Sequence, residues 1–146
     1  MREIKYRAWN KSRNELFFVK SIDFINENAT LYYFDENEDG DNELLVVDNP
    51  YPDGRSKYHI SLDDLILMEY TGLIDRNGKE IYENDICRFI TWENKYEIEL
   101  STIGIIEFKY GSFTFEDIAL YEWMDEENRI NSEVIGNKFE NPELLK

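Results

Sequence analysis

The segment TGLIDRNGKEIYENDI, residues 71–86, gives the strongest indication of the fold, because it joins short apolar runs with two turn signals. Residues 75–78, DRNG, suit a type I turn that Gly78 closes in the left-handed region. They predict a tight hairpin between residues 71–74 and 79–82. Residues 83–85 predict a second turn, and residues 86–90 then run as a strand. The segment therefore steers the chain into the first long strand of a C-terminal β structure.

The rest of the chain has the pattern of many short strands with little helix. Residues 3–9 alternate with period two, which predicts a strand with Arg7 and Trp9 on one face and Ala8 on the other. A polar turn at residues 10–14 leads to a second strand, so a hairpin opens the protein. Further strands are expected at residues 15–20, 22–25, 30–34, 43–47, 65–70, 103–110, 112–117 and 133–136.

Short helical pieces are expected between the strands. Ser61 followed by Asp64 resembles a capping box and predicts one helical turn. Asn141 as N-cap, with Pro142 at the first helical position, predicts a short C-terminal helix. Residues 118–128 fit either a short helix or an irregular loop.

Together these elements predict a mainly β protein of barrel or roll type with short helices. Residues 1–146 are expected to form one domain. Within it, the loop around residues 48–57, with two prolines and a glycine, separates an N-terminal β unit (1–56) from a C-terminal barrel (57–146).

The net charge of −16 is unevenly distributed. Residues 1–20 carry six basic and two acidic residues, a net of +4, so the rest of the chain carries −20. Such a field repels nucleic acid and anionic membranes and attracts basic partners, although high charge can also serve solubility alone. The residues that would give the N-terminal segment a partner-binding role are Arg2, Lys5, Arg7, Lys11 and Arg13.

The acidic run DENEDG, residues 35–40, matches the start of a calcium-binding EF-hand loop, with Asp35, Asn37 and Asp39 as ligands and Asp41 as a continuation. The twelfth position, which needs a bidentate glutamate, is Val46. The flanking runs also predict strands rather than helices. A solvated acidic hairpin tip is therefore favoured over a calcium site.

No other motif indicates catalysis or a cofactor. His59 and Cys87 are the only histidine and cysteine, and their spacing is not that of a zinc site. The sequence has no glycine-rich phosphate loop and no recognisable nucleophile with a base. No apolar run reaches the roughly 18 residues of a membrane helix. With no secretory signal and one cysteine, a cytoplasmic protein is expected.

Three stretches resemble the YopX family of phage and prophage proteins. They are MREIKYRAW (1–9), LMEYTGLIDRNGKEIYENDI (67–86) and EVIGNKFENPELL (133–145). The family usually has glycine where this chain has Asn84, and asparagine is the next best residue for a left-handed backbone, so we expect the turn to be kept. The landmark residues are Trp9, Tyr70, Gly72, Leu73, Gly78, Tyr82, Asp85, Gly136, Asn141 and Pro142.

This resemblance implies an α+β fold whose C-terminal part is an SH3-like barrel, in a bacterial host cell, without a catalytic motif. The landmark residues are interpreted as makers of turns and core rather than as a binding site. Three hypotheses for function follow: an accessory protein that binds a basic host or phage protein, a self-assembling module that uses the basic N-terminal strand, and a nucleic-acid-binding barrel, which the charge opposes. Enzyme activity is not expected.

Overall fold

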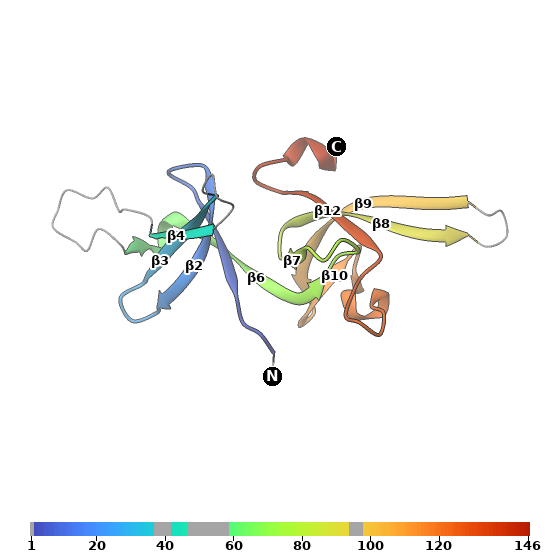
Figure 1. The fold of residues 1–146 in the computed structure, drawn as a ribbon, viewed down its shortest axis with the longest axis horizontal. Coiled ribbons are helices and arrows are strands. Elements are labelled where there is room, and N and C mark those ends of the chain that lie inside the picture. The colour runs from blue at the N-terminus through green and yellow to red at the C-terminus, as the bar shows by residue number, and fades with distance from the viewer. Residues whose placement is uncertain (1, 37–41, 47–58, 94–97) are drawn as a thin grey trace. The chain divides into compact units, whose positions relative to one another are not determined.

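The computed structural model describes residues 2–36, 42–46, 59–93 and 98–146 (Figure 1). Within them the chain is mainly β, with three single-turn 3-10 helices and no α-helix. The prediction of a mainly β protein is therefore confirmed, whereas the α part of an α+β fold is not seen in the described residues. No helix in these ranges is long and apolar enough to span a membrane.

Contacts divide the chain into two units, residues 5–68 and residues 1–4 with 69–146. The division falls inside one strand, β6 (Leu65–Ile74), between Met68 and Glu69. The predicted boundary loop, residues 48–57, lies outside the described residues.

The N-terminal unit is a sheet in which consecutive strands pair as hairpins. Its strand order is β4-β3-β2-β1-β6, and β5 pairs with β3. Its elements are β1 (Tyr6–Asn10), β2 (Glu15–Asp23), β3 (Asn28–Glu36), β4 (Asn42–Val46), β5 (Ile60–Ser61), η1 (Leu62–Asp64) and the start of β6. Its core contains Ala8, Phe17, Ala29, Leu31, Ile60 and Leu65. The predicted turn after Ser61 is confirmed, since the Ser61 hydroxyl accepts a hydrogen bond from the Asp63 N–H at 3.3 Å.

Strand β1 forms where the alternation predicted a strand, and residues on both of its faces are buried. Arg7, Ala8 and Trp9 are all buried. β1 lies between β2 and β6 in the strand order, so side chains of neighbouring strands flank its own on both sides.

The expected strand at residues 22–25 is wrong in its second half. Strand β2 ends at Asp23, and Phe24 and Ile25 lie in the following turn, 74% and 92% exposed. The Asp23 carboxylate accepts the N–H groups of Ile25 and Asn26, both at 3.0 Å, and these bonds lower the pKa of Asp23. Local side-chain bonding thus fixes a turn where the apolar pattern favoured a strand.

The C-terminal unit begins with the segment at residues 71–86, which forms the predicted hairpin. The Gly78 N–H donates to the Asp75 carbonyl at 3.0 Å, and Gly78 has φ 84°. Strand β7 (Glu80–Tyr82) pairs with β6, with Tyr70 opposite Tyr82. Asn84 has φ 66°, which confirms that the asparagine keeps the left-handed turn.

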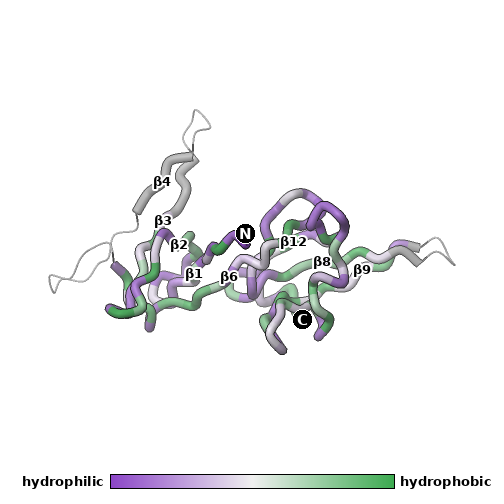
Figure 2. The backbone as a smooth tube through the Cα atoms, turned by 90° about the horizontal axis from the view of Figure 1, so that it is seen from below, coloured by the Kyte–Doolittle hydropathy of each residue, from purple (hydrophilic) through white to green (hydrophobic). Residues whose placement is uncertain are grey.

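The hairpin leads into an antiparallel sheet with the order β11-β10-β9-β8-β12. The elements are β8 (Asp85–Glu93), β9 (Ile98–Lys109), β10 (Ser112–Phe115), β11 (Ile118–Ala119), η2 (Leu120–Trp123), β12 (Ser132–Asn137) and η3 (Pro142–Leu145). Hydrophobic positions recur along β8 and β9 (Figure 2). In the described residues the two ends of this order do not pair, so the expectation of a closed barrel is wrong. Strand β11 has only two residues, after which the chain leaves the sheet as η2.

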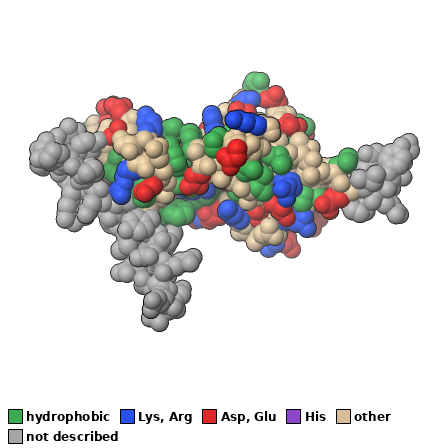
Figure 3. All heavy atoms as spheres, turned by 90° about the horizontal axis from the view of Figure 1, so that it is seen from above, with side chains coloured by type: hydrophobic (Ala, Val, Ile, Leu, Met, Phe, Trp, Pro, Cys, Tyr) green, Lys and Arg blue, Asp and Glu red, His purple; other side chains and the backbone are tan. Residues whose placement is uncertain are grey.

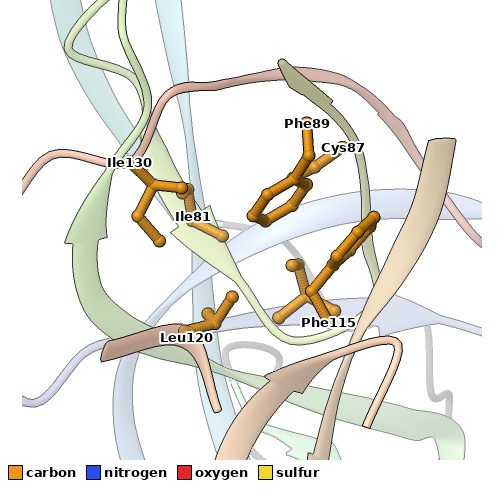
Figure 4. Close-up of a cluster of buried hydrophobic side chains, with 7 residues drawn as sticks. Ile81, Cys87, Phe89, Phe115, Leu120 and Ile130 are labelled. Atoms are coloured by element: carbon orange, nitrogen blue, oxygen red, sulfur yellow. The ribbon is translucent and has the colours of Figure 1, made fainter. Parts of the chain in front are cut away.

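The core of this unit is built around two stacked rings (Figure 4). The centroids of Phe89 and Phe115 lie 3.7 Å apart, with 20° between the ring planes. Ile81, Cys87, Ile106, Leu120 and Ile130 complete the buried cluster. Gly104 leaves room for the stack, because a Cβ there would lie 2.6 Å from the Phe115 ring.

The predicted C-terminal helix is the single turn η3, with Pro142 at its start as expected. Asn141 occupies the N-cap position, but its side chain makes no capping hydrogen bond. Its Oδ1 instead accepts the Asn137 N–H at 3.3 Å and lies where a Cβ on Gly136 would have to be. Gly136 and Asn141 therefore form one closely packed contact.

Candidate functional site

An open, largely apolar groove of about 310 Å³ lies in the C-terminal unit. Strand β6, the β9–β10 hairpin and η2 contribute its walls. Leu120 is nearly fully buried there, whereas Phe108 and Tyr121 are 52% and 65% exposed. Its lining includes Arg2, Leu73, Phe108, Phe113, Leu120 and Tyr121. Exposed apolar groups beside a hollow are typical of a site that another molecule covers.

Local turn chemistry builds one wall of the groove. Lys109 pairs with Ser112, so Tyr110 and Gly111 form a two-residue loop, and both have positive φ, 55° and 78°. Such loops match the right-handed twist of a hairpin. The pairing places Phe108 opposite Phe113, and their rings meet edge to face at 5.2 Å.

Two cations near the groove are already held by carboxylates of the same unit. Arg2 forms an ion pair with Glu69. Lys109 lies 2.8 Å from Glu107 and 3.2 Å from Asp117, and hydrogen bonds to these two carboxylates raise the pKa of Lys109 to about 12. Neither cation therefore gives the groove a net positive charge.

An acidic segment, residues 116–127, continues from the groove through η2. Its carboxylates are Glu116, Asp117, Glu122, Asp125, Glu126 and Glu127, and all six residues are exposed. Asp117 and Glu127 pair with Lys109 and Arg129, the second at 3.4 Å. Glu116, Glu122 and Glu126 form no ion pair within the described ranges. Over the described residues on the face shown in Figure 3, acidic and basic side chains are interspersed.

The five basic residues singled out in the sequence lie in different surroundings. Arg2 belongs to the C-terminal unit and the other four to the N-terminal unit. Arg7 is buried and Lys11 is exposed. Arg13 lies 3.6 Å from Glu15 and covers the Phe17 ring at 5.4 Å.

The calcium-like loop falls mostly outside the described residues. Asp35 lies in β3, opposite Glu43 of β4, which confirms that strands and not helices flank the loop. Asn37, Asp39 and Asp41 are not described. Among the described residues, no three His, Cys, Asp or Glu side chains gather as metal ligands would.

His59 and Cys87 lie in different units. His59 is exposed, and Cys87 is fully buried in the core of its unit. Cys87 packs there as one of the buried side chains of the hydrophobic cluster.

The landmark residues mostly build turns and core. Tyr70 and Tyr82 are buried with ring centroids 5.4 Å apart, and Trp9 is buried in β1. The buried Asp85 carboxylate accepts the Tyr82 N–H at 2.8 Å. Gly72 has φ 84°, a conformation that favours glycine.

Sequence reasoning missed two features. The first is Asp75, which is 1% exposed and binds three N–H groups. Its place at the start of DRNG signals a turn but not its burial. The second is the groove, whose walls come from β6, β9–β10 and η2 and so have no common sequence motif.

Comparisons with known proteins agree with this architecture. A family model described as "YopX protein" matches residues 5–146. The crystal structure of protein EF1440 from Enterococcus faecalis is similar over 100% of both chains, with a TM-score of 0.61 and 21% sequence identity. At that identity the likeness concerns the fold alone. No curated protein matches the chain.

Proposed function

This chain belongs to the YopX family, and from that premise we propose that it is a phage or prophage accessory protein that binds a basic host or phage protein without catalysis. The observation that carries the proposal is the acidic segment 116–127 beside the apolar groove. Carboxylates attract and orient a basic partner, while apolar contacts supply most of the affinity. In this proposal the protein acts in the cytoplasm of the bacterial host.

The charge of the whole chain supports a basic partner. The net charge is −16, and Glu116, Glu122 and Glu126 are exposed without an ion pair among the described residues. A field of this sign speeds the encounter with a cation and slows it with an anion. Binding that relies on this field should weaken as salt is added, because exposed charges are screened over about 8 Å at physiological ionic strength.

The surroundings of Cys87 and His59 support a binding role rather than catalysis. A nucleophilic thiol has to reach its substrate as a thiolate, and Cys87 lies at 0% exposure among Phe89 and other apolar side chains. His59, the only histidine, belongs to the other unit.

Two alternatives remain testable. Self-assembly is favoured by the exposed turn at Phe24 and Ile25, which offers apolar surface outside the groove. Nucleic-acid binding stays a prediction with little support, because Arg7 is buried and Arg13 pairs with Glu15.

The test is capture of proteins from bacterial lysate at low and high salt, read by mass spectrometry. The key variant neutralises the unpaired carboxylates as Glu116→Gln, Glu122→Gln and Glu126→Gln together. A control with the same charge change is Glu27→Gln, Asp63→Asn and Glu143→Gln, all exposed and outside the segment.

We expect a basic protein to be retained by the natural chain and by the control at low salt, and to be lost with the key variant or at high salt. Equal retention by both variants would contradict the proposal. Recovery of the chain's own untagged copies alone would support self-assembly instead.

A further inference from the structure

We propose that the groove binds an extended peptide segment carrying an arginine and a large apolar side chain, and that the chain's own residues 2–4 cover the arginine position until such a segment displaces them. This inference rests on the proposed function and names the chemistry of the partner. Its first support is the contact between Arg2 and Glu69 at the edge of the groove.

The two halves of this ion pair are unequally exposed. The Glu69 side chain is 25% exposed, and that of Arg2 is 58% exposed. Glu69 belongs to β6, whereas Arg2 precedes the first strand. The carboxylate is therefore the fixed half and the guanidinium the replaceable half. Because exposed ion pairs contribute little, the displacement of Arg2 costs little.

A second carboxylate makes the position favourable for a cation. The Glu83 N–H donates to the Glu69 carbonyl at 2.9 Å, so the two residues are neighbours. Burial raises the pKa of Glu83, and the nearby charge of Glu69 adds to this effect. Arg2 pairs with Glu69, whose charge also reaches Glu83, so a cation bound at Glu69 lies in an acidic neighbourhood. An arginine suits this position better than a lysine because its planar donors can bind a carboxylate at two points.

The apolar half of the ligand follows from the groove itself. Leu73, Phe113 and Leu120 offer apolar walls, and Phe108 and Tyr121 leave apolar surface in water. A volume of about 310 Å³ accommodates one large aliphatic or aromatic side chain. Residues 2–4 supply only the arginine, since Ile4 remains 71% exposed. A partner that both fills the groove and binds Glu69 makes apolar contacts that residues 2–4 do not make, so it can displace them.

The experiment titrates the full chain with the blocked hexapeptide GRALRG and follows backbone amide shifts by NMR. GRASRG lacks the apolar side chain, and GKALKG replaces arginine by lysine. We expect GRALRG to shift amides around residues 71–73, 108–113 and 120–121, and both matched peptides to bind more weakly.

Variants test the displacement step. Arg2→Ala frees Glu69 and should tighten GRALRG binding by up to about fivefold, the most that an exposed ion pair usually contributes. Glu69→Gln should weaken binding, and Arg2→Ala with Glu69→Gln should match Glu69→Gln alone. Tyr121→Ser removes an exposed wall and should also weaken binding. Arg13→Ala breaks the ion pair with Glu15 in the other unit and should change nothing.

Unchanged or weaker binding to Arg2→Ala, or shifts confined to other residues, would overturn the inference. The two proposals fail separately. One result would be that capture of a basic lysate protein is lost when the acidic segment is neutralised but persists in Tyr121→Ser and in Glu69→Gln. The proposed function then stands and this inference fails. If GRALRG binds as expected while no basic protein is retained, the groove chemistry stands and the proposed function fails.

Discussion

The carboxylate of Asp75 accepts a hydrogen bond from the backbone N–H of Val134 at 3.0 Å and so joins the β6–β7 hairpin to β12, 59 residues further along the chain. Its other oxygen accepts the N–H groups of Asn77 and Lys79 at 2.8 and 2.9 Å. One buried side chain therefore shapes the turn and fixes the last strand. The segment at residues 71–86 thus has a structural role through Asp75.

Asp75→Ala should destabilise the protein by about 3 kcal/mol or more, because buried N–H groups left without partners cost about 1–3 kcal/mol each. Chemical denaturation measures the loss. The chain offers a matched control in Asp125, whose carboxylate accepts the N–H groups of Glu127 and Arg129 at 2.8 and 2.9 Å in an exposed turn. Asp125→Ala should cost clearly less. Equal losses would show that the bond to Val134 and the burial of Asp75 add nothing.

A second prediction concerns the stacked rings of the C-terminal core. Gly104→Ala places a methyl group 2.6 Å from the Phe115 ring and should destabilise the protein by roughly 1–3 kcal/mol, as overpacking usually does. Thr102→Ala, at an exposed position of the same strand, should change stability little. If the ring is the obstacle, Phe115→Leu should cost less in the Gly104→Ala background than alone. Strict additivity of the two changes would refute this account.

Most turns whose chemistry is local could be predicted from the sequence. The turn at Phe24 and Ile25 was missed, because this apolar pair favoured a strand although the adjacent Asp23 carboxylate holds the turn. The DRNG turn, the Asn84 turn and the single helical turn after Ser61 all depend on residues within a few positions of each other. Their backbone preferences and side-chain bonds act independently of the distant fold. Most longer strands of the two units also follow from apolar runs between such turns, whereas the two-residue strands β5 and β11 were not predicted.

Features that depend on distant partners could not be predicted in this way. Alternation in β1 could not reveal that the strand is central and that Arg7 is buried. The walls of the groove come from β6, the β9–β10 hairpin and η2, which are distant in the sequence. No local pattern predicts that these elements meet, or that the strand order stays open.

The loop of the β9–β10 hairpin gives a third prediction. Tyr110 has φ 55° and is 87% exposed, so its ring gains little from packing while its backbone is strained. Tyr110→Asn should stabilise the protein by about 0.5–1 kcal/mol, because Asn-Gly is the preferred sequence for a loop with two positive φ angles. Tyr110→Phe keeps the strain and should leave stability unchanged. A loss of stability in Tyr110→Asn would mean that the aromatic ring contributes packing which its exposure does not suggest.

A fourth prediction follows from the raised pKa of Glu83. Burial disfavours the charged carboxylate, so the folded protein holds this proton more tightly than the unfolded chain does. Between the unfolded and the folded pKa, the folded state binds more protons, and stability therefore falls as pH rises through this window. Glu83→Gln removes the buried charge, so the variant should be more stable than the natural chain at pH 7, and the difference should shrink toward pH 4. Melting temperatures across this range measure the difference, with Glu126→Gln, an exposed change of the same chemistry, as control. If Glu83→Gln lowers stability at pH 7, the charged carboxylate makes a favourable contact that outweighs its burial.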